Sequence, residues 1–473
     1  GDEESPYYQG RLCARCIALK EAVYHPDRVL YPMRRDPRDR GKADKWERIT
    51  WDEAYDIIEE KVRAIWKDYG PESIVVFGGT GREACIFYYA LTFSVLQSPN
   101  CCYTQSGWSC YGPRCSISDY VLGAGYPELD YAAYFPDRYD DPRYEVPKYI
   151  VLWGKDPLFS NPDGFFGHTL IDLMKRGMKT VVIDPRFTPD AAKADVWLPI
   201  RPGTDVAMTN GWARYIIENK LYDEAWCVKW TNLPFLVNEE TMLLYHADEL
   251  GLGEATDYVV WDANSNSAKA MPWPQDETLS PVLDGEFEVN GKKSRTAFRA
   301  VWDNCAEWTL EKTAEVTWCT PEAIEEAVKI YAEGSPHSGI SIGVATDQYA
   351  QSAQVPEGVT IIESLMGNAC HQGNTIQSRK NQSLGTYFLF PFNLFGPTPL
   401  SPTEEVVNRR LGVIEHKGLN YWMASHIPTI MEAMNTGEPY QPEMWIDRSG
   451  NKLAMLGNAK SWYDVFPEVD YII

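Results

Sequence analysis

The chain has 473 residues, a formal charge of −23 and a sequence pI near 4.8, and its length exceeds what one hydrophobic core usually serves, so we expect two or three lobes. The acidic balance argues against a surface that binds nucleic acid or an anionic membrane. Aromatic residues make up 13% and charged residues 23% of the chain, which excludes a disordered acidic chain, and no apolar run approaches the ~18 residues of a membrane span.

Apolar runs alternate with amphipathic segments along most of the chain. A first helix is predicted over residues 50–66, where Thr50 and Glu53 form a capping-box pattern. The next predicted elements are a strand at 73–79, a helix at 83–97, a strand at 148–154, a helix at 164–176, a strand at 179–184 and a helix at 207–219. Residues 255–300 look like a polar, irregular insertion, after which the pattern resumes with a helix at 321–333, a strand at 339–345 and helices at 354–367 and 424–436. Buried β-branched runs that alternate with helices predict Rossmann-like α/β lobes, with parallel sheets covered by helices on both faces.

Eleven cysteines are present, and several lie close together in the sequence. A chain large enough to bury its own core favours reduced or metal-bound thiols over a disulfide framework. The pair Cys13 and Cys16 is a weak metal signal, because a structural zinc site needs a second pair and an iron–sulfur cluster needs four thiolates. Cys110 lies in a Gly- and Pro-flanked loop near Arg114, which suits a soft-metal ligand, and a buried structural cysteine is the alternative.

Polar loops follow the predicted strands at residues 153–164 and 183–205. Backbone N–H groups and helix N-termini at such strand ends suit phosphates. Carboxylates such as Asp184 and Asp205 suit the hydrogen-bond donors of a ribose or a guanine-like base. Because neither a GxGxxG nor a P-loop sequence is present, a nucleotide site and ordinary loop chemistry both remain open.

Taken together, the motifs resemble the molybdenum and tungsten bis-molybdopterin enzymes of the dimethyl sulfoxide reductase superfamily. In chain order they are GRLCARC (10–16), HPDRVLYP (25–32), SPN (98–100), CYGPR (110–114), WGKDPLFSNPDG (153–164), IDPR (183–186), RPGTD (201–205), GVATDQ (343–348), LMGNACHQG (365–373) and TGEPYQPEMW (436–445). The resemblance covers nearly the whole chain and implies a dimethyl sulfoxide reductase-type fold that lacks its C-terminal domain. The implied limits are a remnant of an N-terminal Fe–S domain at 1–50, a discontinuous α/β domain at 51–104 and 336–473, and an α/β domain at 105–335 with the metal ligand and the pterin-nucleotide loops.

The resemblance also implies roles for residues at matching positions. Cys110 falls at the protein ligand of a Mo or W ion, Cys13 at the last of four cysteines of a [4Fe–4S] cluster, and Arg15 at a basic residue between cluster and pterin. The other three cluster cysteines are absent from the sequence, so the ligand set is incomplete and the N-terminus is expected to be missing. Two molybdopterin guanine dinucleotides are implied, with Arg15, Trp153, Gly154, Lys155, Asp156, Ser160, Asn161, Asp184, Pro185, Arg186, Thr188, Gly203, Thr204, Asp205 and Gln348 on their binding segments.

The type of reaction depends on the residues around the metal ligand. Formate dehydrogenases carry His after that ligand, whereas this chain carries Tyr111, which disfavours formate oxidation. The motifs GGTGRE (78–83), SPN and CYGPR look most like the branch of acetylene hydratase and the anaerobic catechol dehydroxylases. The expected reaction is reductive dehydroxylation of a small catechol-type aromatic, with Tyr111, His168 and His371 as proton donors and Arg114 orienting the substrate; a structural role is the alternative for each histidine and for the tyrosine.

Two other functions stay open. A hydratase-like or transhydroxylase reaction would need no net redox change, and a non-catalytic electron-transfer subunit would use the fold alone. An iron–sulfur electron-transfer subunit is an expected partner, and neither nucleic acid nor a membrane span is expected in this chain. The compartment stays open between the bacterial cytoplasm and export to the periplasm or beyond.

Overall fold

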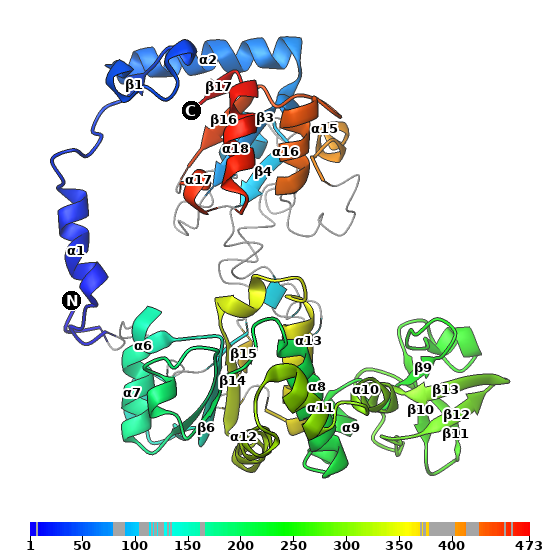
Figure 1. Cartoon of the computed structure of the whole chain (residues 1–473). Helices are drawn as coiled ribbons and strands as arrows, with labels where there is room; N and C mark the ends of the chain where they lie inside the picture. The colour runs from blue at the N-terminus through cyan, green and yellow to red at the C-terminus, as the bar shows by residue number, and fades with distance from the viewer. Residues whose placement is uncertain are drawn as a thin grey trace. The chain divides into compact units, whose positions relative to one another are not determined.

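The computed structural model describes residues 1–5, 8–78, 90–103, 113–114, 117, 121, 127–129, 132, 135–160, 166–368, 371, 375–377, 403–412, 425–448, 451–455 and 457–473. The chain forms two compact units, and each is discontinuous in sequence (Figure 1). Unit 1 contains residues 1–15 and 113–378, and unit 2 contains residues 16–112 and 379–473. The domain limits implied by the resemblance stay a prediction.

Unit 1 is built around a parallel sheet with the strand order β14-β6-β7-β8. Val151 and Trp153 pack into a core on one face of this sheet, whereas Ile150 and Leu152 pack with Leu170 into a core on the other. Strands buried on both faces are continuous apolar runs, which is why these strands were predictable. The expected α/β fold, with helices on both faces of a parallel sheet, is confirmed. The strands are β6 (Tyr149–Trp153), β7 (Lys179–Ile183), β8 (Val196–Leu198) and β14 (Ser338–Ile342).

Several helices of unit 1 begin where a polar side chain caps a free N–H group. Thr296, Thr309 and Thr320 precede three of these helices, and each accepts a backbone N–H three residues later, as expected for N-cap threonine. The apolar stripes of these helices then pack on the sheet and on one another. The helices are α6 (Pro157–Ser160), α7 (Gly167–Lys175), α8 (Asp205–Glu218), α9 (Glu224–Trp230), α10 (Ala297–Cys305), α11 (Leu310–Thr317), α12 (Pro321–Gly334) and α13 (Gln354–Met366).

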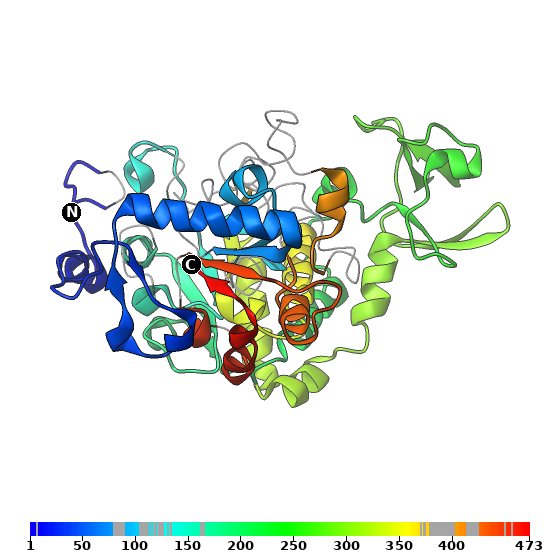
Figure 2. The same cartoon turned by 90° about the horizontal axis from the view of Figure 1, so that it is seen from above.

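The prediction of an irregular insertion at 255–300 is wrong, because this segment contains two antiparallel pairs of strands. They are β10 (Tyr258–Asp262) with β11 (Ser267–Met271), and β12 (Glu286–Val289) with β13 (Lys292–Thr296), which also pairs with β9 (Leu236–Asn238). Their small core is separate from that of the parallel sheet, and Figure 2 shows the module projecting from the helices of unit 1. Asn290 and Gly291 both have positive φ between β12 and β13. An Asn-Gly pair between two strands is the hairpin signal that could have revealed the module.

Unit 2 has a second parallel sheet, with the order β17-β16-β3-β4. The predicted capping box is confirmed, since Thr50 and Glu53 each accept the other's backbone N–H at the start of α2. Helix α2 covers one face of the sheet, and α16 and α18 cover the other. The elements are α2 (Trp51–Asp68), β3 (Ile74–Gly78), β4 (Asn100–Tyr103), α15 (Glu404–Asn408), α16 (Ile427–Thr436), β16 (Met444–Asp447), α17 (Lys452–Met455), α18 (Ala459–Val465) and β17 (Tyr471–Ile472).

The remaining described elements are short. Of the predicted helix at 83–97, residues 83–89 lie outside the described part, and Ala90–Val95 form a π-helix. Within the described ranges, no helix is long and apolar enough to cross a lipid bilayer. The other elements are α1 (Ala14–Val23), β1 (Met33–Arg34), β2 (Glu47–Arg48), β5 (Pro127–Leu129) and β15 (Thr375–Gln377), with 3-10 turns at Pro37–Asp39, Ala43–Lys45, Pro71–Ser73, Arg138–Asp140, Ala191–Lys193, Ala247–Leu250, Val344–Asp347 and Phe466–Glu468.

Candidate functional site

The carboxyl ends of β6, β7 and β14 bring their loops together within unit 1. Gly343 donates its backbone N–H to the carbonyl of Trp153 at 2.7 Å, and Gly154 donates to the carbonyl of Ile183 at 2.8 Å. Gly154 has a φ of +59°, a conformation that favours glycine. A Cβ on Gly343 would collide with the carbonyl of Gly154. These backbone contacts place the loops after three neighbouring strands side by side, where open α/β sheets bind ligands.

Asp205 is positioned by the last residue of β6. The indole N–H of Trp153 donates to Oδ1 of Asp205 at 2.7 Å, and Asp205, the first residue of α8, is buried. Burial and then the Asp205 carboxylate raise the pKa of the nearby Tyr349 hydroxyl. Gly203 has a φ of +82°, and the position of a Cβ there faces open space. This corner offers a carboxylate acceptor together with the free N–H groups of a helix, which complement the N–H donors and the phosphates of a nucleotide.

Asp156 and Asp190 form a buried carboxyl pair between the loops after β6 and β7. They are 8% and 2% exposed, respectively. Burial, followed by the hydrogen bond that protonated Asp190 donates to Asp156, raises the pKa of Asp190 to about 8. Asp190 Oδ2 accepts the backbone N–H of Leu158 at 3.2 Å, and Arg186 lies 3.7 Å from Asp156 Oδ2. Apart from the contact between the two carboxyl groups, Oδ1 of each aspartate has no hydrogen-bond partner among the described residues. The pair shares one proton, so its remaining acceptor lone pairs are suited to donors on a ligand.

Other residues predicted to bind the nucleotide lie in the same loops. Lys155 donates to the hydroxyl of Ser341 at 2.8 Å, and the hydroxyl of Ser160 donates to the carbonyl of Asp156 at 2.7 Å. Asp184 Oδ1 accepts the backbone N–H two residues later at 2.8 Å, which shapes the turn after β7. The structure therefore brings these predicted residues together at one edge of the sheet. Pro185 and Thr188 lie in the loop after β7, Thr204 directly precedes α8, and Gln348 follows the 3-10 turn after β14.

Arg114 is buried and contacts the end of β14. Its Nε donates to Asp347 Oδ2 at 2.7 Å, and its Nη1 donates to the carbonyl of Ile342. The side chains are 5% exposed for Arg114 and 0% for Asp347. Burial raises the pKa of Asp347 to about 6, although the neighbouring guanidinium opposes the shift. The guanidinium is thus engaged by protein groups, and its predicted role toward the substrate stays a prediction.

The two predicted catalytic histidines lie at different ends of the sheet. His168 is the second residue of α7 and lies two residues after Phe166, whose ring is 4.8 Å from the Lys155 ammonium group in the loop after β6. His371 lies 6.0 Å, between ring centroids, from His337, which directly precedes the amino end of β14. The structure therefore places His168 near the strand-end loops and does not place His371 there.

The segment around Cys13 is held against unit 1 by two arginines. Arg11 donates to Asp172 of α7 at 2.8 Å, and Arg15 donates to the carbonyl of Ser160. Burial favours a higher pKa for Asp172, but the hydrogen bonds from Tyr139 and Arg11 together lower it. The contact between Arg15 and Ser160 joins two residues that were predicted separately for the same cofactor.

Several predicted site residues cannot be placed. Cys110, Tyr111 and Asn161 lie outside the described residues. Among the residues that are described, no group of three or more His, Cys, Asp and Glu side chains forms a metal site. The metal-ligand roles of Cys110 and Cys13 stay predictions.

Three buried thiols elsewhere in the chain have raised pKa values. Burial raises the pKa of Cys227 to about 12 and those of Cys305 and Cys319 to about 11. These thiols stay protonated at neutral pH, and buried thiols of this kind are unreactive as nucleophiles.

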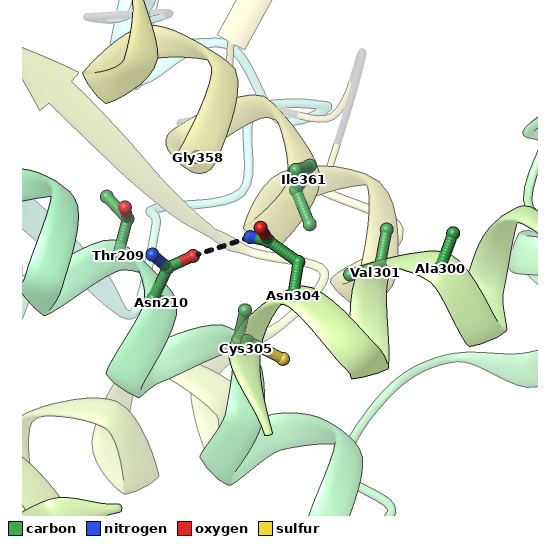
Figure 3. Close-up of a pocket in the computed structure, with 9 residues that line it drawn as sticks. Thr209, Asn210, Ala300, Val301, Asn304, Cys305, Gly358 and Ile361 are labelled. Atoms are coloured by element: carbon green, nitrogen blue, oxygen red, sulfur yellow. Dashed lines mark hydrogen bonds between the residues drawn. The ribbon is translucent and has the colours of Figure 1, made fainter. Parts of the chain in front are cut away.

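A pocket between α8, α10 and α13 was not predicted (Figure 3). It has a volume of about 230 Å³, and most of its lining is apolar or small. Its amides pair with each other, because Asn304 donates to Asn210 at 3.3 Å. The close approach of α13 to α8 at Gly358, where a Cβ would meet Thr209, is the packing that shapes it. The lining residues are Thr209, Asn210, Ala213, Ala300, Val301, Asn304, Cys305, Gly358 and Ile361.

Comparison with known proteins gives consistent matches across the chain. A family model described as molybdopterin oxidoreductase matches residues 28–435. Dopamine dehydroxylase of Eggerthella lenta is 26% identical, over 98% of this chain and 52% of its own length. Acetylene hydratase of Syntrophotalea acetylenica is 25% identical, over 95% of this chain and 53% of its own length. Dimethylsulfide dehydrogenase subunit alpha of Rhodovulum sulfidophilum is 28% identical, over 77% of this chain and 39% of its own length.

A solved structure shares the fold. Acetylene hydratase from Pelobacter acetylenicus aligns with a TM-score of 0.67 at 21% identity, and the alignment covers 98% of this chain and 54% of that chain. The chain thus spans about half the length of the first relatives that it matches.

Proposed function

The chain belongs to the molybdopterin oxidoreductase family, and from this premise we propose that the whole protein catalyses reductive dehydroxylation of a catechol-type aromatic. In that reaction the ring carbon loses a hydroxyl group, gains hydrogen and releases water, with two electrons and two protons consumed. The observation that carries the proposal is the alignment with dopamine dehydroxylase along 98% of this chain. Because this chain and dopamine dehydroxylase are 26% identical, the catechol-type substrate is proposed together with the reaction.

The family implies a Mo or W centre carried by molybdopterin guanine dinucleotide, and the described residues fit its nucleotide arm. Asp205 and the paired Asp156 and Asp190 place carboxyl oxygens at one sheet edge, and Oδ1 of each paired aspartate has no hydrogen-bond partner outside the pair among the described residues. Guanine and ribose supply N–H and O–H donors, and helix N-termini bind phosphate. When bound, the metal centre supplies two-electron redox chemistry.

The residues of this chain would hold and orient that group. Asp205, whose carboxylate is oriented by Trp153, would accept from the base, and the loops that contain Lys155 and Asp184 would bind the diphosphate and ribose. Cys110 is the proposed ligand of the metal, and Cys13 with Arg15 forms the part of the electron path present in this chain. Arg15 already contacts Ser160 of the nucleotide loop.

Proton delivery and electron supply are further parts of the proposal. His168 is proposed to supply protons, and the start of α7 beside the strand-end loops supports this role. An iron–sulfur subunit is proposed as the electron donor, and the match to a relative named as an alpha subunit supports it.

An anaerobic assay of the full-length protein tests the reaction. Reduced viologen and a panel of catechols are supplied, and the expected result is viologen oxidation coupled to loss of one hydroxyl group. Product formation from an alkyne or a polyphenol without any electron donor would instead support the hydratase-like or transhydroxylase alternative, which the match to acetylene hydratase favours. No turnover of either kind by metal-loaded protein would support the non-catalytic alternative.

Elemental analysis tests the metal ligand. Cys110→Ala is expected to lose Mo or W and activity, whereas the control Cys101→Ala removes a buried thiol of β4 and should retain the metal. Wild-type protein with neither metal would contradict the proposed function, and a Cys110→Ala variant with full metal content would remove Cys110 from the site.

A further inference from the structure

The pocket between α8, α10 and α13 lies where three helices face one another with small side chains (Figure 3). Ala213 of α8, Ala300 of α10 and Gly358 of α13 all line it. Helices α8 and α13 approach each other closely at Gly358, because a Cβ there would meet the side chain of Thr209. The small side chains therefore leave a volume of about 230 Å³ that no protein atom fills.

The residues described around the pocket include no side chain that is charged at neutral pH. Lys, Arg, His, Asp and Glu are all absent from this described lining. Burial raises the pKa of the Cys305 thiol to about 11, so the thiol stays protonated. A phosphate, a carboxylate or a metal ion would lose hydration here without gaining an opposite charge. The pocket therefore fits a neutral ligand.

The size of the pocket matches a ligand with one six-membered ring. An apolar cavity of about 150 Å³ already holds benzene, whereas pockets for drug-sized ligands start at about 300 Å³. Val301 and Ile361 supply branched apolar side chains, and the protonated thiol of Cys305 packs as a small hydrophobe. A rigid ring also loses little conformational freedom when it binds. These properties favour a monocyclic aromatic over a flexible chain.

Two amides at the pocket suit the recognition of one hydroxyl group. Nδ2 of Asn304 donates to Oδ1 of Asn210 at 3.3 Å, and Figure 3 shows the two side chains facing each other. This pairing leaves Oδ1 of Asn304 and Nδ2 of Asn210 without a hydrogen-bond partner in the described part of the chain. A hydroxyl group donates one hydrogen and accepts another, so it matches one free acceptor beside one free donor.

We propose that this pocket binds a neutral monocyclic phenol, with the ring between the apolar side chains and the hydroxyl group between Asn210 and Asn304. The ligand class follows from the lining alone, so the inference does not rest on the proposed function. The described lining residues include none of those assigned to the metal or to the nucleotide. Loss of one hydroxyl group from a catechol gives a phenol, so the pocket also suits the class of product of the proposed reaction.

Ligand-observed NMR titration of the full-length protein tests the proposal. The probes are phenol and toluene, which share the ring and differ in the hydroxyl group. Phenol is expected to bind with a Kd of about 1 mM, as is reasonable for a ligand of this size. Toluene is expected to bind about fivefold more weakly, because it leaves the two amide groups without a partner.

Variants of α10 locate the binding. Ala300→Leu places a larger side chain in the pocket and should abolish phenol binding. The matched control is Ala297→Leu, which changes a partly buried alanine of the same helix outside the lining and should leave phenol binding unchanged. Asn304 is exposed, so Asn304→Ala should keep the fold and the apolar side chains. This variant should bind phenol about fivefold more weakly and bind toluene as the wild type does.

Three results would overturn the inference. They are no phenol binding by the wild type well above the expected Kd, equal phenol binding by Ala300→Leu and wild type, and equal affinities of the wild type for phenol and toluene. Melting curves show whether the variants fold. If Ala300→Leu does not fold, Asn304→Ala decides, because its preference for phenol over toluene must be lost if the amides bind the hydroxyl group. The titration needs no turnover, so failure of the proposed function leaves this test valid.

Discussion

Asp190 keeps a proton at pH values where an exposed aspartate has lost it. Burial and the neighbouring Asp156 raise its pKa from 3.8 to about 8. Between these two pH values Asp190 is protonated in the folded chain and ionised in the unfolded chain. Its contribution to the free energy of unfolding therefore falls as the pH rises from about 4 to 8 and stays constant above pH 8. Asp190→Asn keeps the size and the hydrogen-bond donor but cannot ionise. Its melting temperature relative to wild type is expected to increase with pH across this window and then level off.

Thermal melts of the isolated chain at several pH values check this prediction. Asp195→Asn is a suitable control, because Asp195 is partly exposed and lies 3.8 Å from Lys179. A constant difference between Asp190→Asn and wild type from pH 4 to 8 would mean that Asp190 ionises normally.

Trp153 contributes one hydrogen bond that a second tryptophan in the same core lacks. Trp153 donates to Asp205, whereas the indole N–H of Trp212 has no acceptor among the described residues, and both side chains are 0% exposed. Trp153→Phe is expected to lower the free energy of unfolding by about 1–3 kcal/mol more than Trp212→Phe, because it leaves a buried acceptor with one donor fewer. Urea unfolding of the two variants measures this difference, and equal losses would show that the bond adds nothing to stability.

At the scale of elements, the strand-end loops depend on a backbone approach that only glycine permits. Gly343 is not strained, with φ −91°, but its Cβ position overlaps the carbonyl of Gly154. Gly343→Ala should therefore cost about 1–3 kcal/mol of unfolding free energy through overpacking and shift the loops after β6 and β14.

The matched control is Gly177→Ala. Gly177 has a φ of +101° and open space at its Cβ position, so only backbone strain opposes alanine there. Urea unfolding measures the stability of both variants, and a guanine-retention assay measures their bound nucleotide. The Gly343 variant should lose bound nucleotide, and the Gly177 variant should retain it. If both variants retained all of their bound nucleotide, the contact between Gly343 and Gly154 would not be needed for the nucleotide-binding loops to form.

Much of the fold was predictable, because strands buried on both faces leave a continuous apolar run. The predicted strand at 148–154 is observed as β6 (Tyr149–Trp153), and the predicted helix at 321–333 as α12 (Pro321–Gly334). The module at β9–β13 was missed because its strands mix polar and apolar residues, with only one side packed in its small core.

The site was predictable only in part. Loop position and residue type identified Asp184 and Asp205, since carboxylates after parallel strands favour nucleotide donors. The pairing of Asp156 with Asp190, and of Arg114 with Asp347, depends on tertiary packing between loops that the sequence separates by 34 and 233 residues. No local sequence pattern indicates contacts between such distant residues.

At the scale of the whole molecule, the β9–β13 module joins the rest of unit 1 through two adjacent backbone segments and through Leu283, which packs in the core beside the parallel sheet. Phe298 donates to the carbonyl of Leu233, and Ala297 donates to that of Phe235, both at 2.8 Å. Replacing residues 236–295 with a short Gly/Ser link should therefore leave the parallel sheet of unit 1 folded. Hydrogen exchange in β6 and β7 checks this, and loss of protection there would show that the module supports the sheet.

The discontinuity of unit 2 has a consequence for synthesis on the ribosome. Strand β3 is flanked by β4 on one edge and by β16 on the other, and all of residues 113–378 are translated between them. At about 5–20 residues per second, the edge that receives β16 stays unpaired for tens of seconds. An apolar strand with an open edge is a template for aggregation. We therefore expect production of this protein to depend on chaperones that bind nascent chains, and slower translation to lower its yield.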